Sequence, residues 1–181
     1  MPRFTRRILR ALPVPLALAA VGALMLPAAA PAGDAPAFKH GDFMALNSRG
    51  KAPNTSSDSM RQVYEFDLYS LATGEKIGTA VDDIFCSTST PPPCQVFDAK
   101  TTFKLPDGEF TNHAQVSVVF DPQRPGWVLV ASLPSSRGII SGTGAYEGRT
   151  GTVILTGVND ATSYPAELGV DDRWVIQFDP K

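Results

Sequence analysis

The sequence is poor in the residues that metal and redox chemistry require. It has only two histidines and two cysteines in 181 residues, which is too few for a tetrahedral site built from Cys and His ligands. Basic charge is also scarce, because 16 Lys and Arg are set against 18 Asp and Glu. Nucleic acids and anionic membranes attract basic surfaces. We therefore expect no metal site, and neither nucleic acid nor membrane as a partner of the mature chain.

Several catalytic motifs are absent as well. The chain has no G-x-S-x-G nucleophile turn and no phosphate-binding loop. Gly142-Thr143-Gly144 is not followed by the helix that a dinucleotide fingerprint requires. His113 lies among polar residues with no motif that supplies a nucleophile or an orienting partner, so we interpret it as a solvated histidine. The sequence therefore predicts no cofactor.

The one long apolar run lies near the start of the chain. Leu12 to Leu26 follows a segment with four arginines and no acidic residue, and Ala28-Ala29-Ala30-Pro31-Ala32 comes next. The run is shorter than the roughly 20 residues that span a bilayer, and the order is typical of a cleaved secretory signal. We predict a signal peptide over residues 1–32, with a retained membrane anchor as the alternative. The expected location is the bacterial periplasm or the extracellular space, and Thr5-Arg6-Arg7-Ile8-Leu9 leaves the export route open.

Removal of this segment would leave 149 residues with 12 basic and 18 acidic side chains, a formal charge of −6. Both cysteines remain, and Cys86 and Cys94 flank Ser-Thr-Ser-Thr-Pro-Pro-Pro. Three prolines make this segment an irregular loop, because each lacks an N–H donor and has a fixed φ angle. In an exported protein the simplest interpretation is a disulfide that closes the loop. A reactive thiol or a metal-binding pair is the alternative.

Composition divides the rest of the chain into two parts. Residues 33–61 are rich in Ala, Gly, Pro, Asn, Ser and Lys and show little periodicity, so we expect a flexible N-terminal lead. Residues 62–181 alternate with period two, as in Tyr64, Phe66 and Leu68 against Glu65 and Asp67. Seven or eight short strands separated by turn signals indicate an all-β sandwich or closed barrel.

A barrel is favoured because some strands carry apolar residues on both faces. In residues 76–86, one face holds Asp83 and Phe85 and the other holds Asp82 and Ile84. The strand over 127–133 is apolar on both sides too. Such strands suit a barrel whose outer surface is also covered, by loops or by neighbouring subunits.

The most distinctive segment is the glycine-rich stretch from Gly142 to Gly151, which leads into Thr152-Val153-Ile154-Leu155-Thr156. Its density of glycine excludes a helix and predicts a sharp corner in a curved antiparallel sheet. The pattern resembles the glycine-rich strand pair of the allene oxide cyclase and dirigent barrel superfamily. Asp67-Leu68-Tyr69-Ser70 and the hairpin Thr101 to Gly108 are similar to further elements of that superfamily. The resemblance implies an eight-stranded antiparallel barrel with an apolar interior, forming a homodimer or homotrimer.

The resemblance also implies a function. Plant allene oxide cyclases close the ring of a reactive fatty-acid epoxide, and dirigent proteins steer the coupling of phenoxy radicals. We therefore expect an exported barrel that binds a small hydrophobic or phenolic molecule and guides its cyclisation or stereoselective coupling without a cofactor. The alternative is a non-catalytic ligand carrier or surface protein on the same barrel or on a lipocalin-like one. Whether the chain is an enzyme stays open.

Neither catalytic set of the superfamily is present. Thr150 stands where dirigent proteins commonly carry an arginine, and Arg149 is shifted by one residue, which moves it to the other face of a strand. From its own pattern the sequence offers Asp83 as a candidate catalytic acid, if it faces the interior and has a raised pKa. The alternative for Asp83 is a strand-end hydrogen bond to the cysteine loop. The candidate ligand-binding residues, which could also be ordinary packing residues, are Tyr64, Tyr69, Phe85, Phe103 and Tyr146.

Overall fold

The computed structural model describes residues 43–58, 61–86, 94–134 and 138–180. The predicted signal peptide lies outside these residues. A short 3-10 turn, η2 (Gly144–Tyr146), connects the seventh and eighth strands. The strands are β1 (Phe43–Pro53), β2 (Arg61–Ser70), β3 (Lys76–Cys86), β4 (Val96–Leu105), β5 (Gly108–Phe120), β6 (Trp127–Ser132), β7 (Gly138–Gly142), β8 (Gly151–Asp160) and β9 (Glu167–Phe178).

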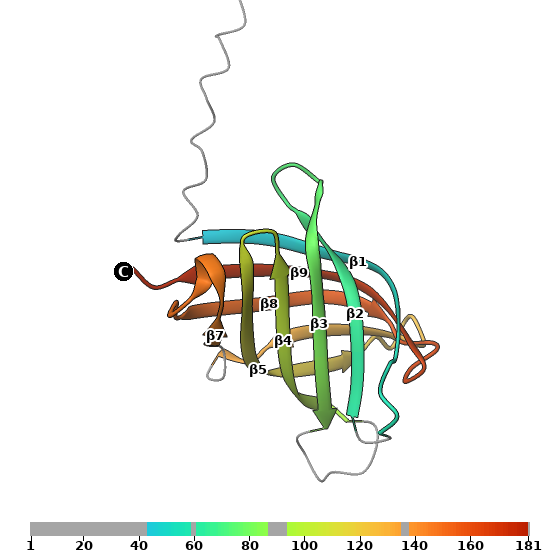
Figure 1. The fold of residues 1–181 in the computed structure, drawn as a ribbon. Coiled ribbons are helices and arrows are strands. Elements are labelled where there is room, and N and C mark those ends of the chain that lie inside the picture. Colours follow the sequence, from blue (N-terminus) through green and yellow to red (C-terminus); the bar gives the residue numbers. More distant parts are fainter. Residues whose placement is uncertain (1–42, 59–60, 87–93, 135–137, 181) are drawn as a thin grey trace, which may run out of the picture. The chain divides into compact units, whose positions relative to one another are not determined.

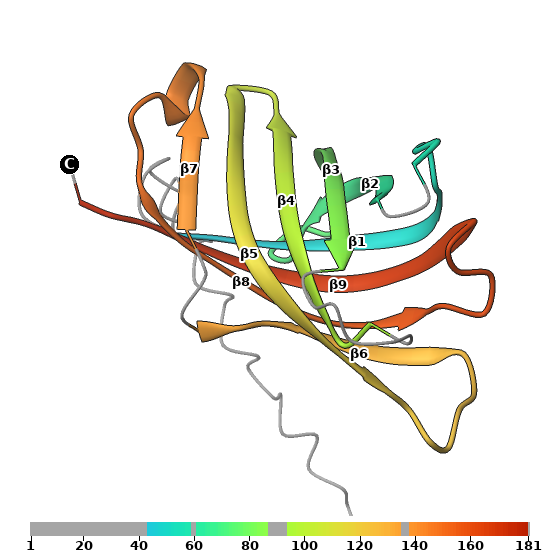
Figure 2. The ribbon, with the colours of Figure 1, turned by 90° about the horizontal axis from the view of Figure 1, so that it is seen from below.

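The strands form a closed eight-stranded antiparallel barrel, as the sequence predicts. Neighbours follow the order β4, β3, β2, β1, β9, β8, β6 and β5, and the pairing of β5 with β4 closes the circle (Figures 1 and 2). Although there are nine strands, the barrel has only eight strand positions, because β6 and β7 share one. β6 pairs with β5 from Val116 to Phe120, and β7 pairs with β5 from Phe110 to His113. The two short strands therefore act as one interrupted strand along β5.

The first strand corrects the predicted domain boundary. β1 lies within the segment 33–61 that we expected to be a flexible lead, yet it pairs with β9 along its whole length and also with β2. Its alternation is hidden in the sequence because the buried positions include the polar Ser48 beside the apolar Leu46 and Ala52. Leu46, Ser48 and Ala52 are nevertheless almost completely buried. Within the described residues, the barrel therefore already includes Phe43–Pro53 and does not start at residue 62.

Two ends of the barrel follow from the antiparallel order. The connections β1–β2, β3–β4, β5–β6 and β8–β9 lie at one end, which we call the loop end. The turns β2–β3 and β4–β5 and the glycine-rich segment lie at the other, which we call the turn end. Cys86 and Cys94 form a disulfide at the loop end, in agreement with the prediction.

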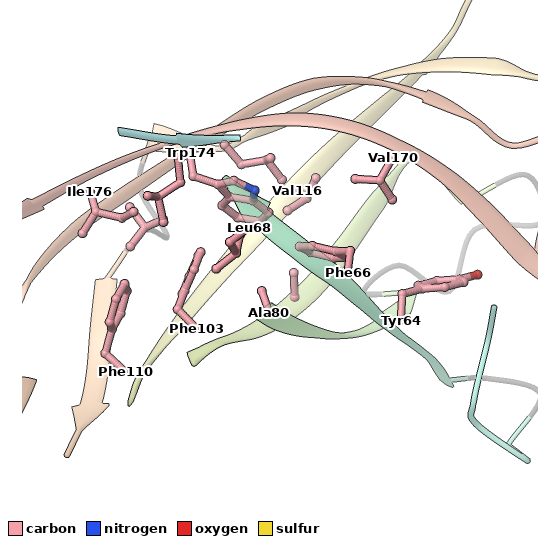
Figure 3. Packing of buried hydrophobic residues seen from close by; sticks show 14 of the residues in the cluster. Tyr64, Phe66, Leu68, Ala80, Phe103, Phe110, Val116, Val170, Trp174 and Ile176 are labelled. Carbon is pink, nitrogen blue, oxygen red and sulfur yellow. The ribbon is translucent and has the colours of Figure 1, made fainter. Parts of the chain in front are cut away.

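Aromatic rings fill the interior toward the turn end. Phe66 stacks on Trp174 at 6.2 Å between ring centroids, Trp174 meets the ring of Phe103 edge-on at 5.2 Å, and Phe103 stacks on Phe110 at 4.7 Å. Figure 3 shows the labelled side chains in succession from Phe110 to Tyr64. This continuous contact makes the turn end a well-packed core.

The glycine-rich segment closes a seam in the barrel wall. Among the described residues no ladder joins β7 to β8, and the ring of Tyr146 in η2 fills the space between them. It packs against Phe110 at 5.1 Å and Phe178 at 5.5 Å. Gly144 permits this turn because it has a φ of +59° and because a Cβ there would lie 2.3 Å from the carbonyl oxygen of Asp107. The predicted corner is therefore confirmed.

Candidate functional site

A row of polar side chains crosses the interior toward the loop end. Tyr64 on β2 is paired with Asp82 on β3, Asp82 with Thr101 on β4, and Thr101 with Asn112 on β5. Directly paired residues of neighbouring strands point to the same face of a sheet. Because Tyr64, Thr101 and Asn112 are almost completely buried, this shared face is the inside of the barrel.

Asp82 is the acidic member of this row. Thr101 Oγ1 donates a hydrogen bond of 2.8 Å to Oδ1 of Asp82. Loss of hydration inside the barrel raises the pKa of Asp82 to about 6, against the opposing effect of the Thr101 hydrogen bond, and the charge of Asp83 adds to the rise. The carboxyl of Asp82 therefore holds its proton to a much higher pH than an exposed aspartate does.

A second interior carboxyl comes from β9. Asp172 is buried, and its Oδ1 has no hydrogen-bond partner among the described residues. Burial raises the pKa of Asp172 well above its ordinary value, and the charge of Asp82 raises it further. Because the charge of one acts on the other, we refer to Asp82 and Asp172 as the acid pair.

Space for the second carboxyl comes from a glycine on the neighbouring strand. Gly157 on β8 is the direct partner of Asp172, and a Cβ on Gly157 would lie 1.8 Å from Oδ1 of Asp172. The side chain of Asp172 thus lies over bare backbone inside the barrel. A residue with any side chain at position 157 would have to displace it.

Inward-facing residues near the loop end remain in contact with solvent. Asp82, Ile84 and Val118 are only partly buried, although Ile84 and Val118 pack against the core. At the turn end, by contrast, Phe103 and Phe110 are at most 1% exposed. Solvent therefore reaches the interior from the loop end and stops at the aromatic core.

The β8–β9 connection is tied to this end of the barrel by two tyrosines. The Tyr64 hydroxyl donates to the carbonyl oxygen of Pro165 at 3.0 Å, and the Tyr164 hydroxyl donates to Oε1 of Gln62 at 3.0 Å. Burial raises the pKa of both hydroxyls, so they stay protonated and act as donors. These contacts fix the loop beside the row that contains Asp82.

The structure divides the residues predicted from sequence between the inside and the outside. Asp83 lies on the outer face of β3 and forms an ion pair with Arg61. The interior position that we expected of Asp83 belongs to its neighbour Asp82. Phe85 is 44% exposed on the same outer face, and Tyr69 lies beside Asp67 with its hydroxyl 3.5 Å from Oδ2.

The other three predicted residues lie inside. Tyr64 borders the acid pair at the loop end. Phe103 belongs to the aromatic core, and Tyr146 reaches the same core through Phe110. The Tyr146 hydroxyl donates to Oδ1 of Asp107 at 2.9 Å. Of the predicted set, only Tyr64 therefore lies inside the barrel beside Asp82.

The sequence contains a signal for the residues that were missed. Asp82 shares its face with Ala80 and Ile84, and Asp172 precedes Trp174 and Ile176 at the same two-residue spacing. An acidic residue that continues an apolar alternation is a candidate for an interior position. The choice between the two faces of β3 required the pairing with Tyr64 and Thr101.

No helix among the described residues has the length and hydropathy needed to cross a membrane. No group of three or more His, Cys, Asp or Glu side chains in the same part of the chain could hold a metal ion.

Comparison with known proteins gives only distant likenesses of fold. No protein-family profile matches the chain, and no curated protein matches it in sequence. A solved structure of a pyocyanin demethylase is similar over 76% of this chain and 99% of its own, with 18% identity and a TM-score of 0.41. A nonspecific heme-binding cyclase, which catalyses a cycloaddition during neoabyssomicin biosynthesis, is similar over 78% of this chain and 66% of its own, with 14% identity and a TM-score of 0.43. Neither likeness carries an assignment of function.

Proposed function

We propose that the chain is a binding barrel for a small apolar or phenolic molecule, which lies inside the barrel at the loop end. The observation that carries this proposal is the partial exposure of the inward-facing Asp82, Ile84 and Val118. Ligand sites are typically concave and apolar, with a few polar groups that fix orientation. This end of the interior offers that combination.

The lining supplies both kinds of contact. The stacked rings of Phe66 and Trp174 lie next to these positions on the turn-end side, while Thr101 and the acid pair supply polar atoms. The resemblance of the glycine-rich segment to the allene oxide cyclase and dirigent superfamily supports the same proposal, because those barrels hold apolar and phenolic molecules.

The two tryptophans of the chain make a direct test possible. Trp174 is in the core and Trp127 is on β6, so Trp127→Phe leaves one reporter inside the barrel. We expect 4-ethylphenol to change the fluorescence of Trp174 in a saturable manner. The matched variant Trp174→Phe, which keeps only the outer reporter, should show no saturable change. An equal, non-saturable response in both variants would contradict binding inside the barrel.

Guided cyclisation without a cofactor is the second candidate function, and the acid pair favours it. A carboxyl with a raised pKa can donate its proton to an epoxide oxygen and recover a proton when the product forms. The test is the stereochemistry of product from an unsaturated fatty-acid epoxide with the unmodified chain, with Asp82→Asn and with Asp83→Asn. We expect Asp82→Asn to give racemic product at the uncatalysed rate and Asp83→Asn to behave as the unmodified chain. Racemic product from all three would reject catalysis of this reaction.

Export and self-association complete the proposal. Mass spectrometry of the chain from its producing cell should give a mature N-terminus at Gly33, in the periplasm or the medium. The proposed homodimer or homotrimer would use the exposed apolar side chains Val119 on β5, Leu129 on β6 and Ile154 on β8. Sedimentation of the unmodified chain and of Leu129→Lys tests this, since a monomer at all concentrations for both would contradict self-association.

A further inference from the structure

The interior of the barrel holds the carboxyl groups of Asp82 and Asp172 without a basic counterpart. Neither Asp82 nor Asp172 forms an ion pair with a Lys, Arg or His side chain among the described residues. Basic side chains lie outside instead: Arg61 pairs with Asp83, and Lys76 with Asp67. Buried carboxyls normally have a cation or a full set of hydrogen-bond donors. Asp172 has neither, because its Oδ1 accepts no hydrogen bond among the described residues.

The hydrogen-bond donors around the acid pair leave one carboxyl oxygen without a hydrogen bond. Thr101 serves Oδ1 of Asp82, and Asn159 hydrogen-bonds to the side chain of Asp172. Oδ1 of Asp172 has no partner within the described part of the chain. Its residue is 5% exposed, and the oxygen occupies the space that Gly157 leaves free. A buried acceptor in this condition points to a donor that the protein itself does not supply.

The route from solvent and the side chains around the acid pair indicate which kind of molecule carries that donor. Solvent reaches the interior at Asp82 from the loop end, so a small molecule can approach the acid pair from this side. Beyond the acid pair lies the aromatic pair Phe66 and Trp174, which suits an apolar ring. The complementary molecule is therefore apolar, with a hydrogen-bond donor of positive charge near one end.

We propose that the acid pair binds the protonated nitrogen of a small hydrophobic amine inside the barrel. An ammonium group donates up to three hydrogen bonds, so it can supply the donor that Oδ1 of Asp172 lacks. Its positive charge favours the ionised form of a nearby carboxyl, and its apolar part lies against the aromatic core. This inference rests on the proposed ligand binding and specifies the chemical class of the ligand.

The experiment compares three molecules that share one shape: 2-phenylethylamine, 2-phenylethanol and phenylacetate. Each is titrated into Trp127→Phe, with the fluorescence of Trp174 as the signal. We expect the amine to bind at least about tenfold more tightly than the alcohol, because charge-assisted hydrogen bonds are the stronger ones, and the anion not to bind. Equal affinity for amine and alcohol would overturn the inference while leaving the proposed binding function intact. Binding of none would overturn both.

Variants of the acid pair test where the amine binds. Asp172→Asn and Asp82→Asn, each in the Trp127→Phe background, should lose the preference for the amine and retain binding of the alcohol. The matched controls Asp171→Asn and Asp83→Asn remove one negative charge each from the neighbouring outward positions, and they should keep the preference. If the two controls also lose the preference for the amine over the alcohol, that preference comes from the net negative charge of the chain, and the inference is overturned. The amine-to-alcohol ratio uses the unmodified acid pair, so it decides the question even if an interior variant fails to fold.

Discussion

Oδ1 of Asp172 occupies the place where a side chain at Gly157 would begin, since a Cβ there would lie 1.8 Å from that oxygen. We expect Gly157→Ala to destabilise the fold by roughly 1–3 kcal/mol, because the methyl group must displace a buried carboxyl that has little room to move. The measurement is urea unfolding followed by fluorescence. Gly138→Ala is the matched control, because a Cβ at Gly138 meets nothing within 4 Å. Equal stability of the two variants would contradict this packing.

The acid pair should make stability depend on pH. The pKa of Asp82 is about 6 in the folded chain, against an ordinary value of 3.8. Between these values the folded chain holds a proton that the unfolded chain has lost, so the stabilisation is complete below about pH 4 and is lost as pH rises through 6. The loss is roughly 3 kcal/mol for Asp82, and Asp172 acts in the same direction.

Urea unfolding at intervals from pH 4 to pH 7 measures this dependence. Asp82→Asn should make the decline smaller by the share that belongs to Asp82 and leave the share of Asp172, because an amide does not titrate and can still accept from Thr101. Asp83→Asn, which changes an outward residue paired with Arg61, should leave the decline in place. A stability that rises between pH 4 and pH 6 in the unmodified chain would show that the acid pair is not buried as described.

Periodicity predicted the strands with regular apolar alternation and failed where polar residues face inward. Tyr64, Phe66 and Leu68 could be placed on one inner face, since all three have large side chains that are mainly apolar. β1 could not, because its buried Ser48 is polar and accepts a hydrogen bond of 3.0 Å from Nε1 of Trp174, a residue 126 positions away in the sequence. Such a partner is invisible to any local pattern.

The candidate site was missed for a related reason. β3 has apolar residues on both faces, so alternation separates Asp82 from Asp83 without saying which of them is inside. Only the pairing with neighbouring strands decides, and it places Asp82 beside Tyr64 and Thr101. The disulfide was simpler to predict, because both cysteines flank one short loop and no other cysteine competes for them.

The disulfide should contribute measurably to stability. Cys86 and Cys94 are eight residues apart in sequence, and closing a loop of this length restricts the unfolded chain by an amount worth about 2–3 kcal/mol. We expect Cys86→Ser with Cys94→Ser to lower the free energy of unfolding by that amount. A reductant should have the same effect on the unmodified chain and none on the double variant. An unfolding curve of the unmodified chain that does not shift on reduction would contradict the prediction.

Tyr146 should hold the seam between β7 and β8 closed. Its ring packs between Phe110 and Phe178, and its hydroxyl donates to Asp107. We expect Tyr146→Phe to cost about 1 kcal/mol, the usual value of one hydrogen bond, and Tyr146→Ala to cost about 3–5 kcal/mol through the cavity it leaves. Hydrogen exchange gives the sharper measurement, because a seam that opens locally exposes the amides of β7 and the first half of β8. In Tyr146→Ala these amides should exchange faster, while the exchange of the β3 and β4 amides changes less. Faster exchange of equal size in all strands would instead mean that the ring stabilises the whole barrel and not the seam alone.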